Sequence, residues 1–146
     1  MANGAIHATA RYGDVMFIGG TFRKLREVLS PGISSGPQVT GLTGLAAIDM
    51  RTGEGIASFK PQLQAAATQT LDVQALAVVG DTLYVGGQFN AIDGVPRLNL
   101  AAIDIDPVTL IGSVDPGFAA SVGDPSGNLA TTEVLKILPG SDGLFL

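Results

Sequence analysis

The sequence predicts an all-β protein made of a repeated unit of short strands, and three observations support this fold class. Twenty glycines and eight prolines lie between short apolar runs, where they mark turns. The runs are rich in Val, Ile and Leu and lack a convincing helical period. One strand pattern also recurs along the 146 residues. With 46% hydrophobic and 14% charged residues, the composition is that of a folded protein.

The repeat is clearest where residues 6–22 align with residues 73–89 at an offset of 67. A third copy starts at Val134, which matches Val73 at an offset of 61. A second block, Leu45–Met50, recurs as Leu100–Ile105 at an offset of 55. These offsets divide the chain into a first unit at 1–72, a second at 73–133 and the start of a third at 134–146.

Each unit is predicted to hold four short elements. In the second unit these are the following segments: Val73–Val79, Thr82–Phe89, Asn99–Ile105 and a weaker one near Gly112–Ala119. Their short apolar runs indicate strands that are buried on both faces, as in stacked sheets. Residues 63–70 are expected to form a turn or a loop.

A unit of this size cannot bury both of its faces alone, so it needs neighbours of the same kind. We therefore expect a β-propeller-like array of four-stranded blades, with about two and a half repeats present. Four blades would need about 220 residues, so the expected ring is incomplete. Further blades of the same protein, or self-association through open blade edges, would complete it.

The drop in offset from 67 to 55 places an insertion in the first unit, between Arg23 and Thr43. Long insertions on a rigid scaffold often carry binding, although a surface excursion without a role fits equally well. The insertion supplies our candidate contact residues: Arg23, Lys24, Arg26, Ser34, Ser35 and Gln38.

The glycine pairs at 19–20 and 86–87 are predicted to allow close approach of neighbouring backbones. They precede Phe22 and Phe89, which we expect to be buried. A phosphate-binding loop is disfavoured because no Lys-Ser or Lys-Thr follows either pair and no helical pattern begins there.

Catalytic chemistry is poorly supported. His7 is the single histidine, and it aligns with Gln74, so we expect an ordinary strand residue. We predict no catalytic, cofactor-binding or metal-binding residue, and no cofactor.

Aspartates recur at the first hairpin of each copy and at the end of the third strand, which indicates hydrogen bonding in turns. These residues are Asp14, Asp81, Asp142, Asp49 and Asp104. Calcium binding by Asp93, Asp104 and Asp106 remains an alternative.

Composition also limits the partners. A net charge of −5 with only eight Lys and Arg argues against nucleic acid, because such binding relies on basic side chains. No apolar run approaches the roughly 20 residues of a membrane helix, so we expect no membrane insertion. The absence of cysteine excludes disulfides and thiolate metal sites. Residues 1–7 lack the pattern of a signal peptide.

Three segments of the second unit, Val73–Val78, Leu83–Phe89 and Leu100–Asp104, resemble the bacterial delta-60 type β-propeller repeat, a kelch-like propeller. The insertion in the first unit, which also lacks the Asp-Gly turn, departs from that pattern.

The resemblance implies tandem blades in large secreted or cell-surface proteins of bacteria or phages, acting as non-catalytic scaffolds that bind a protein or glycan surface. The alternative is the propeller portion of an enzyme, quinoprotein-like or sugar-active, whose catalytic residues lie in other blades.

Overall fold

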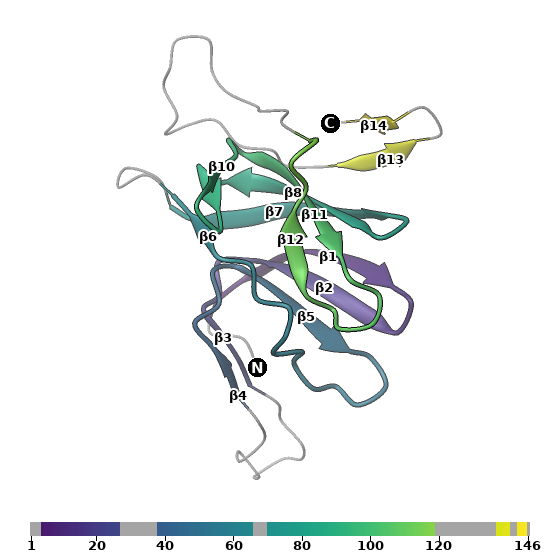
Figure 1. Cartoon of the computed structure of the whole chain (residues 1–146). Coiled ribbons are helices and arrows are strands. Elements are labelled where there is room, and N and C mark those ends of the chain that lie inside the picture. The colour runs from purple at the N-terminus through teal and green to yellow at the C-terminus, as the bar shows by residue number, and fades with distance from the viewer. Residues whose placement is uncertain (1–3, 27–37, 66–69, 119–136, 141–142, 146) are drawn as a thin grey trace.

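A computed structural model describes residues 4–26, 38–65, 70–118, 137–140 and 143–145 (Figure 1). All regular secondary structure in these ranges is β-strand, in antiparallel sheets, which confirms the predicted all-β class. The third unit contributes one hairpin to the described residues, formed by β13 (Leu138–Gly140) and β14 (Gly143–Phe145).

Each of the first two units builds one larger sheet. The first sheet has the order β1-β2-β5, and an isolated bridge between Ile48 and Gly55 extends it. Its strands are β1 (Ile6–Tyr12), β2 (Val15–Gly20) and β5 (Leu45–Asp49). The second sheet has the order β12-β11-β8-β7. Its strands are β7 (Asp72–Val79), β8 (Thr82–Gln88), β11 (Leu100–Ile105) and β12 (Gly112–Val114).

Small hairpins between the second and third strands of each unit were not anticipated. The supposed loop of the first unit begins and ends in paired strands, β3 (Lys24–Arg26) and β4 (Gln38–Thr40). The second unit has β9 (Ala91–Ile92) and β10 (Val95–Pro96) in the same place. The expected loop at 63–70 contributes β6 (Leu63–Gln64), which pairs with β9.

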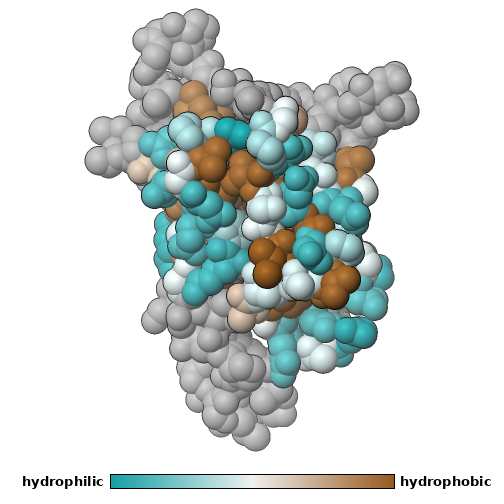
Figure 2. All heavy atoms as spheres, viewed as in Figure 1, coloured by the Kyte–Doolittle hydropathy of each residue, from teal (hydrophilic) through white to brown (hydrophobic). Residues whose placement is uncertain are grey.

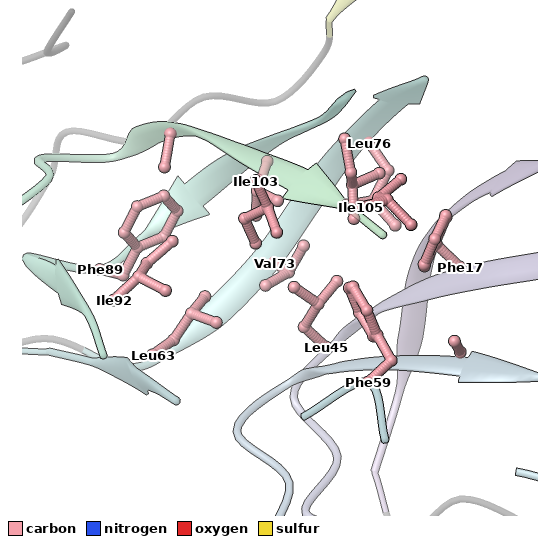
Figure 3. Packing of buried hydrophobic residues seen from close by; sticks show 14 of the residues in the cluster. Phe17, Leu45, Phe59, Leu63, Val73, Leu76, Phe89, Ile92, Ile103 and Ile105 are labelled. Atoms are coloured by element: carbon pink, nitrogen blue, oxygen red, sulfur yellow. The ribbon is translucent and has the colours of Figure 1, made fainter. Parts of the chain in front are cut away.

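The two larger sheets stack face to face, and their backbones come closest where β7 lies against β1 and β2 (Figure 1). Gly19 permits this approach, because a Cβ there would overlap Cγ1 of Val73. Large side chains from both sheets fill the space between them, and Figure 3 shows Phe17, Leu45 and Phe59 of the first unit facing Val73 and residues of the second. The main hydrophobic core is therefore the interface between units.

Both units repeat an unusual feature of the backbone. A register shift interrupts the first hairpin at His7 in one unit and at Gln74 in the other, as their alignment predicts. Beside these shifts, a Cβ on Gly20 would overlap the Ala5 carbonyl oxygen, and one on Gly87 would overlap that of Asp72. Close approach of neighbouring backbones thus explains the second glycine of each pair.

Candidate functional site

The hairpin of β3 and β4 carries half of the predicted contact residues. Figure 1 shows it leaving the first sheet on the side away from the second sheet. The backbones of Lys24 and Arg26 lie on β3, and that of Gln38 lies on β4. Ser34 and Ser35 fall outside the described residues. The structure therefore brings three of the six positions together on one small ribbon.

Arg23, another of the six candidate contact residues, lies at the base of this hairpin and bonds to neighbouring backbone. Its Nη1 donates to the carbonyl oxygens of Thr21, at 2.8 Å, and Phe22, at 3.0 Å. Phe22 itself is fully buried, as predicted, and so is Phe89. The half-buried Arg23 guanidinium thus fixes the entry of the hairpin onto the core.

The second unit shows what this hairpin looks like without an insertion. Ile92 pairs with Val95 across the two-residue turn Asp93-Gly94, in which both residues have positive φ, 50° and 79°. Such a turn is typical of tight hairpins. Asp93 Oδ1 also accepts a hydrogen bond from Gln62 N at 2.8 Å, which ties this hairpin to the first unit.

Asp49, which recurs as Asp104, stabilises its own turn, and in the second unit Asp106, two residues after Asp104, does so instead. Asp49 accepts bonds from the backbone N of Arg51 at 2.8 Å and from its Nη2 at 3.2 Å. The side-chain bond to Arg51, followed by its backbone bond, lowers the pKa of Asp49. Asp106 accepts bonds from Thr109 N and Val108 N, which lower its pKa in the same way.

Two polar contacts join β1 to the first hairpin of the second sheet, at opposite ends of β1. Tyr12 Oη donates to Asp81 Oδ1 at 2.5 Å, and this bond is the main cause that raises the pKa of Tyr12. His7 Nδ1 lies 2.9 Å from Oδ1 of the buried Asp72, whose Oδ2 accepts from Gln74. His7 therefore lies in a strand, as expected, and its polar contact joins the two sheets.

The structure does not gather Asp93, Asp104 and Asp106, the residues of the calcium alternative, into one cluster. In the described part of the chain, no group of three or more His, Asp or Glu side chains could hold a metal ion. Asp93 and Asp106 instead accept backbone hydrogen bonds in separate turns. The same described residues include no helix long and apolar enough to span a membrane.

Known proteins give no direct guide to this site. No protein-family model matches the chain, and searches of curated proteins and of solved structures find no match.

Sequence reasoning missed two features that bear on the site. It did not anticipate the hairpin at the base of the insertion or the contact of Asp72 with His7. The alignment contained a signal for the hairpin, since Lys24 and Ala91 correspond at the offset of 67. It held no comparable signal for Asp72, because its counterpart Ala5 cannot make the same bond.

Proposed function

We propose that this chain is a segment of a β-propeller, similar to the delta-60 type, that serves as a non-catalytic binding or adhesion scaffold. We place it in a larger protein, secreted or at the surface of a bacterium or phage. The observation that carries the proposal is that the packing between the first and second units recurs between the second and third.

The recurrence extends to individual side chains. Leu76 of the second unit belongs to the same cluster as Ala8, Ala10 and Leu45 of the first. At the next interface Ile137, which aligns with Leu76 at the offset of 61, packs with residues that align with those three. They are Ala75, Ala77 and Leu100. A contact made twice in succession is the behaviour of stacked repeats.

An aromatic pair is repeated in the same way. The ring centroids of Phe17 and Phe59 are 4.7 Å apart in the first unit. In the second unit those of Tyr84 and Phe118 are 5.3 Å apart, and Tyr84 aligns with Phe17 at the offset of 67. Each unit thus covers the aromatic side chain of its second strand with a Phe that follows the last strand of its larger sheet.

The packing of the sheets supports blades that radiate from an axis. The sheets approach most closely at the first strand of the second unit, which lies against β1 and β2. Larger residues such as Phe59, Phe89 and Ile92 fill the core elsewhere (Figure 3). Wedge-shaped packing of this kind suits the blades of a propeller around a central channel.

A binding role is supported by the hairpin of β3 and β4. It is a short ribbon on a packed sheet, and residues 27–37 replace the two-residue turn found in the second unit. Segments with this placement often carry recognition. The partner we propose is a protein or glycan surface.

The experiment replaces residues 27–37 with Asp-Gly, the turn of the second unit, so that Arg26 and Gln38 flank a two-residue loop. These residues already pair across the hairpin, so the shortened chain should fold. We expect the full chain to bind members of a glycan array or a set of extracellular matrix proteins, and the shortened chain to lose that binding.

A matched control is Val108→Ser, which changes the most exposed large apolar side chain, at 88% exposure, in a turn outside the hairpin. It should bind as the unaltered chain does. Unchanged binding by the shortened chain would show that residues 27–37 are not needed for binding. Absence of binding by the full chain would contradict the scaffold role.

A further inference from the structure

We infer that the outward face of the first sheet, together with the open edge of β3, is the docking site for another unit of the same kind, placed before the first unit in tandem. We define the outward face by five apolar residues of the first unit that do not belong to the core between the sheets: Ile6, Met16, Ile18, Ile48 and Met50. The inference rests on the proposed repeat architecture and names the partner of one surface.

The second unit shows what covers such a face. At the offsets of 67 and 55, the five residues of the outward face align with five residues of the second unit. These are Val73, Leu83, Val85, Ile103 and Ile105, all buried in the core between the units. The first unit therefore covers this face of the second.

Exposure of this face is greatest at Ile6 and Met50, whereas Ile18, at 2%, is already covered by Phe22 and Leu42 of its own unit. Ile6 is 48% exposed, whereas its counterpart Val73 is fully buried. Met50 is 43% exposed, and its counterpart Ile105 is 4% exposed. These two residues account for two of the five exposed large hydrophobic side chains among the described residues. Their exposure is explained by their place at the face where a unit is absent.

The edge of β3 gives a second, independent argument. In the second unit, β9 pairs with β10 on one side and with β6 of the first unit on the other. Asn90 N donates to Gln64 O at 2.7 Å, and Asp93 N donates to Gln62 O at 2.8 Å. The tail of one unit thus adds a strand to the hairpin of the next.

The counterpart of β9 is β3, since Ala91 aligns with Lys24 at the offset of 67. In the described part of the chain, β4 is the only strand that pairs with β3. Among the described residues, no strand of the first unit takes the position that β6 fills in the second. One preceding unit would fill both this edge and the outward face.

The chemistry of the occupant follows from the face that the first unit presents to the second. It offers small residues along its first strand, Ala8 and Ala10, with Gly19, Phe17 and Leu45 beside them. An unrelated partner would have to match both the apolar outward face and the edge of β3. A repeat unit has the surfaces that match both, so we propose a repeat unit as the occupant.

One region of the outward face is polar. Thr9 and Arg11, both exposed, stand where the second unit has Leu76 and Val78. Replacing Thr9 by Leu should therefore tighten the docking of a preceding unit, because Leu76 fills the same place at the existing interface.

The test is a tandem chain in which residues 1–72 are followed directly by residues 6–146, so the spacing between units is preserved. In the added unit, Met16→Leu and Met50→Ile introduce the residues of the second unit. Only the original Met16 and Met50 then report on the outward face. Their oxidation by hydrogen peroxide is followed by mass spectrometry, since exposed methionine oxidises faster.

We expect Met50 to oxidise several-fold more slowly in the tandem chain than in the chain alone, with slower amide exchange in β3. Thr9→Leu in the original unit should increase the protection. Ala10→Glu in the added unit, on the side that faces the original, should remove it. Amide exchange of the strands in the added unit confirms that this unit is folded.

Equal oxidation of Met50 in both chains, with the added unit folded, would overturn the inference. So would protection of Met50 in the chain alone that grows with protein concentration, because a second molecule would then occupy the face. Both proposals involve the hairpin of β3 and β4, but the array measurement changes residues 27–37 and the oxidation measurement reads Met50, so the two proposals can fail separately.

Discussion

The two complete units share one backbone plan and differ in what covers the same face. In the second unit, Leu83 and Ile103 lie fully buried against the first unit. In the first unit, the matching Met16 and Ile48 are half-buried. Both units use apolar residues at these places, so position in the array decides how much each side chain contributes to stability.

The largest expected effect comes from truncating the same residue in both units. Ile103→Ala should lower the free energy of unfolding by about 2–5 kcal/mol, because it leaves a cavity in the core. Ile48→Ala should cost clearly less, since its site is half open. Urea denaturation of the two variants measures the difference, and equal losses would mean that the two faces are equally covered.

Gly19 tests how closely the sheets must approach. A Cβ there would overlap Val73, so Gly19→Ala should cost about 1–3 kcal/mol through overpacking. Combining it with Val73→Ala should recover part of this loss, and a double-mutant cycle by urea denaturation gives the coupling. Additive losses would show that the two residues do not meet.

Asn99 and Gly44 occupy equivalent positions, at which the backbone of both units has a positive φ. They align at the offset of 55, both have positive φ, and both donate from N to the carbonyl oxygen of the buried Phe of their unit. Asn99 Oδ1 also accepts from Phe89 N at 3.2 Å.

Asn99→Ala should cost about 1–3 kcal/mol, because it removes this buried bond and leaves an unfavourable φ. Asn99→Gly keeps the backbone freedom that Gly44 has and should cost less. Thermal unfolding of both variants compares their losses of stability. A larger loss for Asn99→Gly than for Asn99→Ala would contradict the role of the positive φ.

The smallest effect concerns the contact between Tyr12 and Asp81, where the second unit has Val79 in place of Tyr12. Folding raises the pKa of Tyr12, so the stability from this bond is present below the ordinary tyrosine pKa of about 10 and is lost as pH rises through the folded value.

Asp81→Asn should lower the pKa of Tyr12 in an ultraviolet titration. The matched control is Asp14→Asn, at the equivalent turn of the first unit, which should leave that pKa unchanged. If both variants lowered the pKa of Tyr12, the cause would be the negative charge near this end of the molecule and not the bond to Asp81.

Much of the unit could be predicted from the sequence, because its signals are local. The fixed offsets aligned His7 with Gln74, where both first hairpins shift register, and they predicted the burial of Phe22 and Phe89. The strand β6 could not be predicted, since two residues show no period and their partner lies in the next unit. Of the candidate contact residues, Arg23 donates to the carbonyl oxygens of Thr21 and Phe22, which no spacing reveals.

The central claim is that one interface recurs along the chain, and truncation of Ile137 tests it most directly. Ile137 is 5% exposed and packs on the second unit as Leu76 packs on the first. Ile137→Ala should therefore destabilise the protein by about 2–5 kcal/mol in urea denaturation, as Leu76→Ala should. A change within about 0.5 kcal/mol, the range of ordinary surface substitutions, would contradict the recurrence.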